Sequence, residues 1–294
     1  MKDLLKLAVC WIAFALSLVA GGAIGQILHL HVGAMPGGVT AESMFAAQLA
    51  AGVVLVVGLY PLARGLAARG IVRVGVVAGF LLLALGLNGV IEARCFTHFL
   101  DQGAGAAIVF DVSLAAILGM AVGLCFGSAG EPFGLARRTW SAWMVRAGAA
   151  WIGWPLIYFL FGMCIAPIVT PYYRAGIAGL RIPSSVLTIF GIQMIRSVVF
   201  LASSLPLVAL WKGSRRGLWL TLGLAHACTV GLYEIAGATY LPTILRVVHS
   251  VEMTCDAFAY AGLLVLLFTA PGARTSANAM AERQMGKLSA QGTR

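Results

Sequence analysis

Long apolar runs dominate this chain, and short polar or basic segments separate them. A bilayer core of about 30 Å requires roughly 20 apolar residues in one helix, and eight runs reach about that length. They lie at about 7–28, 44–63, 71–92, 105–127, 143–167, 185–210, 217–236 and 244–269. The pattern predicts an all-α fold, a polytopic integral membrane helix bundle that forms one unit over residues 1–272. A disordered cytoplasmic tail is predicted for residues 273–294.

The fifth run differs from the others because Pro155 and Pro167 interrupt it. Proline is tolerated in membrane helices when neighbouring groups satisfy the freed carbonyls. The segment 171–174, Pro-Tyr-Tyr-Arg, is predicted to lie in the loop that follows this run. Gly176 and Gly179 in the same loop are typical of a flexible lid or a re-entrant turn.

The composition supports the membrane class. Hydrophobic residues account for 61% and charged residues for 10% of the 294 positions, whereas soluble globular chains carry about 25% charged residues. So few charges cannot enclose an apolar interior of this size in water. We therefore expect membrane lipids to be the principal partners of the chain.

Lys and Arg residues fall mainly on one side of the predicted membrane. When the ends of the eight spans are assigned alternately to two sides, 15 of the 20 basic residues lie on the side of the N-terminus. Cytoplasmic loops carry such an excess, so both termini are predicted to be cytoplasmic, as in a bacterial inner-membrane protein. The formal net charge of +10 then reflects topology, and no nucleic-acid partner is expected.

One short motif occurs twice. Gly89-Val-Ile-Glu92 in the third span resembles Gly231-Leu-Tyr-Glu234 in the seventh. Gln48 and Gln193 likewise occupy the second and sixth spans. A duplicated four-helix unit explains these matches, and chance similarity within apolar sequence is the alternative.

Ionisable residues within the spans are the main functional signal. They cost about 2.5–3.5 kcal/mol each on insertion scales, so they usually face a bundle interior or a water-filled cavity. The polar residues predicted to lie in spans are Asn88, Glu92, Asp111, Gln193, Arg196, His226, Glu234, Arg246, His249, Glu252 and Asp256. At about 1.5 Å of rise per residue, none of the ionisable ones lies in the cytoplasmic half. We therefore predict a polar cavity that is open to the extracytoplasmic side.

The eighth span carries the densest cluster. At about 100° per residue, its ionisable residues share an arc of about 120°: Arg246, His249, Glu252 and Asp256. The candidate catalytic residues are His249, Glu252 and Asp256. His249 with Glu252 would move a proton or hold a metal, and Asp256 would orient or charge the site.

The other polar residues are candidates for substrate binding. Arg196 and Arg246 can hold a phosphate or carboxylate. The supporting candidates are Gln193, Glu92, Asp111, His226 and Glu234. Two arginines among five carboxylates leave an excess of acid, which requires protonated carboxyl groups, a cation or a protonated histidine.

Cofactor binding is left open by these residues. His249, Glu252 and Asp256 can ligate zinc, iron or manganese, but their spacing is not the H-E-x-x-H of metalloproteases, and an ion-pair network would use the same residues. His226 and His249 can serve as axial haem ligands, which is the weaker signal because no supporting motif surrounds them. No metal ligand is assigned.

Three function classes follow. Serine-hydrolase elbows, phosphate loops and dinucleotide fingerprints do not occur in the sequence. The one-sided polar groups favour a membrane-embedded enzyme or binding protein that acts on an anionic, lipid-like small molecule. A small-solute or proton-coupled transporter is the alternative, because carriers place their sites near the midplane. A structural or sensory subunit without catalysis is the third class, and the oligomeric state is open.

Overall fold

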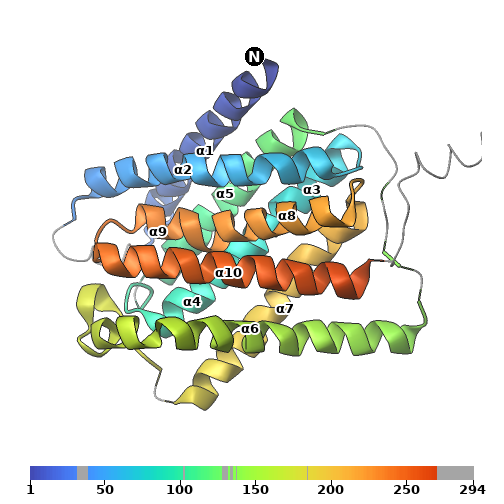
Figure 1. The fold of residues 1–294 in the computed structure, drawn as a ribbon. Coiled ribbons are helices and arrows are strands. Elements are labelled where there is room, and N and C mark those ends of the chain that lie inside the picture. The colour runs from blue at the N-terminus through green and yellow to red at the C-terminus, as the bar shows by residue number, and fades with distance from the viewer. Residues whose placement is uncertain are drawn as a thin grey trace, which may run out of the picture.

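A computed structural model describes residues 1–31, 39–101, 103–127, 132, 135–136, 138–183 and 185–269. These residues form a helical bundle without strands (Figure 1). Within them, eight helical segments are long and apolar enough to cross a membrane, which confirms the number of long apolar helices predicted from the sequence. The predicted tail, 273–294, lies outside the described residues.

The eight segments keep the order of the predicted spans. They are α1 (Lys2–Ile27), α2 (Ala41–Gly65), the third segment Gly70–Phe96, α5 (Ala104–Cys125), α6 (Trp140–Arg174), α7 (Val186–Leu210), the seventh segment Arg215–Gly237 and α10 (Thr243–Phe268). Ser and Thr residues begin several of them, because a side-chain oxygen at the N-cap satisfies a free backbone N–H. The N-caps Thr40, Thr139, Ser185 and Ser214 accept hydrogen bonds in this way at the starts of α2, α6, α7 and α8.

Helix α6 differs from the fifth predicted span. It continues through Pro155, Pro167 and Pro171 to Arg174, although an interruption and an earlier end were expected. Each proline removes one N–H from the helix, and membrane helices tolerate this when other groups take up the freed carbonyls. Tyr173 therefore lies in the last turn of a helix and not in a loop.

The third and seventh segments each contain a π-helical stretch. The third consists of α3 (Gly70–Phe80), the π-helical Leu81–Leu87 and α4 (Asn88–Phe96). The seventh consists of α8 (Arg215–His226), the π-helical Ala227–Leu232 and α9 (Tyr233–Gly237). π-Helical turns are rare and are found often at functional sites.

The bundle consists of two similar four-helix units. We shifted the first four segments along the sequence by the number of residues that separates Glu92 from Glu234. Each of their ends then falls within about five residues of the corresponding end in the last four segments. Helix α5 packs against α1 and α3, just as α10 packs against α6 and α8. Helix α2 packs against the seventh segment, and α7 packs against the third. The second helix of each unit therefore contacts the other unit. These correspondences support a duplicated unit over a chance match.

The two ends of the bundle differ in charge. Helices α1, α3, α6 and α8 begin at one end, which we call the basic end because its described basic residues are Lys2, Lys6, Arg64, Arg69, Arg73, Arg138, Arg146, Lys212, Arg215 and Arg216. The opposite end has Arg94, Arg174, Arg181 and, in the first turn of α10, Arg246. Figure 1 shows α2, α8, α10 and α6 side by side, running between these two ends.

Candidate functional site

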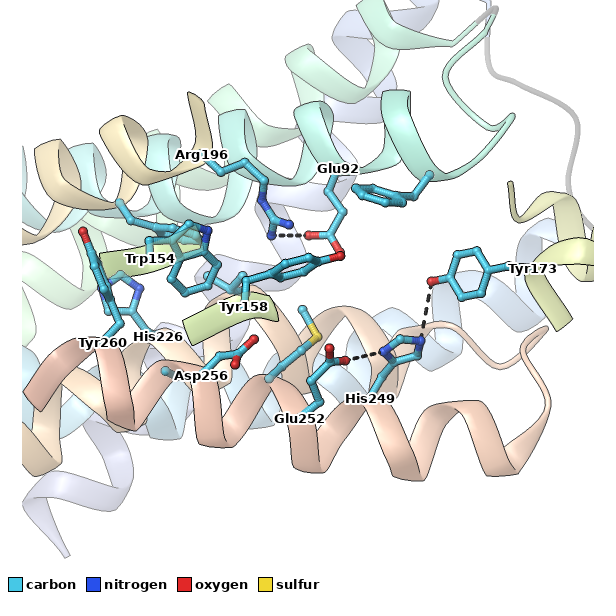
Figure 2. Close-up of a pocket in the computed structure, with 15 residues that line it drawn as sticks. Glu92, Trp154, Tyr158, Tyr173, Arg196, His226, His249, Glu252, Asp256 and Tyr260 are labelled. Atoms are coloured by element: carbon cyan, nitrogen blue, oxygen red, sulfur yellow. Dashed lines mark hydrogen bonds and ion pairs between the residues drawn. The ribbon is translucent and has the colours of Figure 1, made fainter. Parts of the chain in front are cut away.

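A small cavity lies inside the second unit, where α4 of the first unit meets it. Its volume is about 60 Å³, and a water molecule needs about 10–15 Å³ of such space, so it has room for a few water molecules. Its polar lining residues are Glu92, Tyr158, Tyr173, Arg196, His226, His249, Glu252, Asp256 and Tyr260. In Figure 2, Arg196 and Glu92 lie on one side, and Asp256 and Glu252 lie on the other.

Arg196 is a deeply buried charge in the wall of the cavity. Its side chain is 2% exposed, and each guanidinium nitrogen has an acceptor. Nε donates to Oδ1 of Asn88 at 2.8 Å, Nη1 to Oε1 of Gln193 at 3.3 Å and Nη2 to Oε2 of Glu92 at 2.5 Å. Nε1 of Trp154 donates to the same Gln193 oxygen at 3.0 Å. The charge of Arg196 is therefore neutralised by Glu92 and held in place by amide oxygens.

His249 and Glu252 form a second pair, one turn apart on α10. Nδ1 of His249 lies 2.7 Å from Oε2 of Glu252, and Nε2 of His249 lies 3.5 Å from the hydroxyl of Tyr173 (Figure 2). The Glu252 side chain is 7% exposed and that of His249 is 20% exposed. The pair has the geometry of a proton-accepting imidazole oriented by a carboxylate.

Asp256 lies one further turn along α10, halfway between the helix ends. It is 4% exposed, and its Oδ1 has no hydrogen-bond partner among the residues that the structure describes. Buried polar atoms of this kind are rare and usually indicate a water, an ion or a functional role. Asp256 also lines the cavity, so this buried oxygen lies close to the space that water can occupy.

His226 is held at the deep end of the cavity. Its Nε2 lies 2.8 Å from Oγ of Ser204, and the rings of Phe80 and Phe200 pack edge-on against the imidazole. The ring is 3% exposed. This environment favours a neutral imidazole that is oriented by one hydroxyl group.

Six of the ten predicted site residues line the cavity, and four do not. Those that line it are Glu92, Arg196, His226, His249, Glu252 and Asp256. Gln193 supports Arg196 from outside the lining. Asp111 lies beside Gly86, and Glu234 lies beside Gly89, so the structure does not bring these carboxyl groups to the cavity.

Arg246 has a different environment from the one expected. Its Nε and Nη2 donate to the carbonyl oxygens of Ile235 and Ala236 at 3.1 and 3.3 Å. These carbonyls belong to the last turns of α9, where basic side chains often satisfy the free acceptors. Arg246 therefore caps a neighbouring helix and is not among the lining residues.

Sequence reasoning missed the contribution of α6. Trp154 and Tyr158 line the cavity from this helix, and their spacing of four residues places them on one helix face. Tyr173 was predicted to lie in a loop and was not a candidate site residue, but its hydroxyl faces His249. The sequence does contain these aromatic residues on one face of the helix, but aromatic residues that line a cavity are hard to distinguish by sequence from those that contact lipid.

The side chains around the cavity offer limited support for a bound metal or haem. Within the described part of the chain, no group of three or more His, Cys, Asp or Glu side chains has an arrangement that could hold a metal ion. His226 and His249 both line the cavity, but a volume of about 60 Å³ has no room for a haem between them. Proton transfer and water binding are the chemistry that this arrangement supports best.

A second polar cluster lies in the loops of the opposite end. Asp101 contacts Arg94, lies 2.9 Å from Nδ1 of His98 and 3.4 Å from Nη2 of Arg181. The hydrogen bond with His98 holds the pKa of the Asp101 carboxyl below its ordinary value, and both arginines act in the same direction. Backbone hydrogen bonds from Arg181 to Phe96 and from His98 to Gly179 join the same two loops. This cluster ties the first unit to the loop between α6 and α7.

Comparisons with known proteins do not identify a relative. The eight apolar helices fit a multi-pass membrane protein, and any narrower function has to be argued from the cavity. No family model matches this chain, and no curated protein and no solved structure matches it.

Proposed function

We propose that this chain is a proton-coupled transporter of a small solute in a bacterial cytoplasmic membrane, and that Asp256 is its proton-binding carboxyl group. The observation that carries this proposal is the buried, incompletely hydrogen-bonded Asp256 at the middle of a membrane-length helix, facing a water-sized cavity. Ionisable residues within membrane spans commonly mark proton relays and ion pathways.

The charges around the cavity support a proton or a small cation as the bound species. Arg196 is already paired with Glu92, and Glu252 is paired with His249. Asp256 forms no ion pair among the described residues, and a carboxylate without a direct partner is costly to bury. Uptake of a proton or of a cationic solute removes this cost, whereas an anionic ligand would increase it.

A line of titratable groups connects Asp256 with the opposite end of the bundle. Asp256, Glu252 and His249 follow one face of α10 over about 10 Å, and the hydroxyl of Tyr173 comes next. The excess of basic residues favours a cytoplasmic basic end, with both termini on that side. Protons would then enter from the extracytoplasmic side.

The architecture also favours a carrier. Parallel repeats related by an axis along the membrane normal are one of the arrangements found in secondary transporters, and two units of four helices fit it. Each unit has a π-helical stretch in its third segment. Such stretches allow a helix to adjust locally when the two units move relative to one another.

Proton-coupled flux in proteoliposomes tests the proposal. The vesicles enclose a pH-sensitive dye, and small amines, amino acids, sugars, carboxylates and phosphate are added to the acidic outside. We expect at least one solute class to cause proton entry, and D256N to abolish it. D111N removes a carboxylate that does not line the cavity, so it should retain the flux. Equal flux in D256N and the unaltered protein would contradict the proposal.

A membrane-embedded enzyme that acts on an anionic amphiphile is the second candidate. The contact between His249 and Glu252 favours it, because the pair resembles a general base with its orienting carboxylate. The cavity volume and the engagement of both Arg196 and Arg246 argue against it. Incubation with extracted membrane lipids, followed by mass analysis, separates the two: a lipid product that disappears in H249A would favour the enzyme.

A further inference from the structure

A larger hollow lies on the outer surface of the bundle, at the basic end between α8 and α10. Its volume is about 630 Å³, within the range of small-molecule sites. Arg215, Arg216 and Trp219 line it from α8, and Phe258, Leu263 and Leu266 line it from α10. We call this hollow the α8–α10 groove. It is separate from the cavity around Asp256, and the two share no lining residue.

Specific contacts shape the floor of the α8–α10 groove. Nε1 of Trp219 donates to the carbonyl oxygen of Phe258 at 2.8 Å, which fixes the indole against α10. Gly262 leaves space for that indole, since a Cβ atom there would come within 3.3 Å of Nε1. The groove is therefore shaped by a hydrogen bond and by a glycine at the contact.

The charge at the groove is unbalanced. Neither Arg215 nor Arg216 has an ion-pair or hydrogen-bond partner within the described ranges of the chain. The rest of the lining is apolar, and Leu266 is 70% exposed. Two guanidinium groups without a partner among the described residues therefore lie at the polar margin of an apolar groove, at the end of a membrane-length helix.

We infer that the α8–α10 groove binds one anionic phospholipid of the surrounding leaflet. Arg215 and Arg216 would hold the phosphate, because guanidinium groups pair with phosphate oxygens through charge-assisted hydrogen bonds. An acyl chain would lie along Phe258, Leu263 and Leu266. Basic pockets between membrane helices bind anionic head groups for this reason. A zwitterionic lipid would bring its own cation near the arginines, so the groove should discriminate by head-group charge.

Native mass spectrometry of the full chain tests this inference. The purified protein is offered equal amounts of phosphatidylglycerol and phosphatidylcholine of the same chain length. We expect preferential retention of phosphatidylglycerol. R215A/R216A should reduce that preference about tenfold, because the choline cation of phosphatidylcholine then no longer lies beside two guanidinium groups; a tenfold change corresponds to about 1.4 kcal/mol. R216A alone should have a smaller effect in the same direction, and it keeps the test valid if the double variant does not fold.

Two further variants distinguish a site from general surface charge. K2A/R69A removes two exposed basic residues of the same end outside the groove, and it should keep the preference. A259W fills the groove with both arginines intact, because Ala259 is a lining residue, and it should lose the bound lipid. The inference is wrong if the unaltered protein retains both lipids equally, if K2A/R69A loses as much preference as R215A/R216A, or if A259W binds normally.

Discussion

The contact between Glu92 and Arg196 offers the sharpest test of the site geometry. The Arg196 side chain is 2% exposed and that of Glu92 is 30% exposed. Removing one partner of a buried ion pair costs about 3–5 kcal/mol, because the other charge stays buried and uncompensated. Since water can reach the space left by Glu92, we expect E92A to cost the lower part of that range, about 3 kcal/mol of unfolding free energy.

Replacing Arg196 should have a smaller effect. R196M leaves Glu92 able to hydrate, but it leaves the Asn88 oxygen without its donor, and an unsatisfied buried acceptor costs about 1–3 kcal/mol. The double variant E92A/R196M has no unpaired charge. We therefore expect its cost to be about 2 kcal/mol below the sum of the two single variants, within the usual range for residues in contact.

Unfolding by increasing SDS in mixed micelles, followed by tryptophan fluorescence, measures these free energies. The exposed pair between Asp3 and Arg64, whose side chains are 48% and 57% exposed, serves as the matched control, and a cycle of D3A and R64M should give a much smaller coupling. Additivity of E92A and R196M to within about 0.5 kcal/mol would refute the buried ion pair.

Three further predictions concern the rest of the bundle. Because the pKa of Asp101 is lowered in the folded state, this carboxylate stabilises the fold at pH values above the ordinary aspartate pKa of about 3.9. The contribution is lost as pH falls through the lowered pKa. D101N should therefore flatten the dependence of the melting temperature on pH in that acidic range. A Cβ at Gly119 would lie 2.7 Å from the backbone of α3, whereas Gly75 has no such neighbour, so G119A should lower stability by about 1–3 kcal/mol and G75A should not. S204A should cost about 1–3 kcal/mol, because the imidazole beside Ser204 loses its partner, and unchanged unfolding would contradict this contact.

The spans were predictable because lipid imposes one simple requirement on them. A helix that crosses a bilayer has to be apolar for about 20 residues, and that pattern is visible without an alignment. The helix ends were less predictable. Helices capped by Thr40 and Thr139 begin a few residues before their apolar runs, and α6 passes through three prolines. Hydrophobicity alone contains neither signal.

The site was predictable only where one helix carried it. The 100° periodicity of an α-helix placed His249, Glu252 and Asp256 on one face of α10, and all three line the cavity. The same periodicity included Arg246, but a long side chain can turn back to a neighbouring helix end, as it does toward α9. Asp111 lies outside the cavity because the relative rotation of packed helices is decided by tertiary contacts, such as the close approach at Gly86.

The two units differ in the polar residues that they contribute to the cavity. Glu92 and Glu234 occupy equivalent places, but Arg196 follows Gln193 by three residues, and the residue three after Gln48 is Ala51. The second unit therefore supplies an arginine to the glutamate of the first, and the first supplies none in return. The position equivalent to Asp256 in α5 is Leu114, which is buried in the apolar core. Most of the residues that line the cavity therefore belong to the second unit.

This asymmetry constrains any transport cycle. The hydrogen bonds from Arg196 to Asn88 and Glu92 cross from α7 of the second unit to α4 of the first. Separating these helices would leave the buried guanidinium group of Arg196 without its carboxylate, at a cost of several kcal/mol. The α4–α7 contact should therefore stay closed and act as the pivot. Helices α6 and α10 carry Tyr173, His249 and Asp256, and in a proton-coupled carrier they are the elements whose movement would open the cavity.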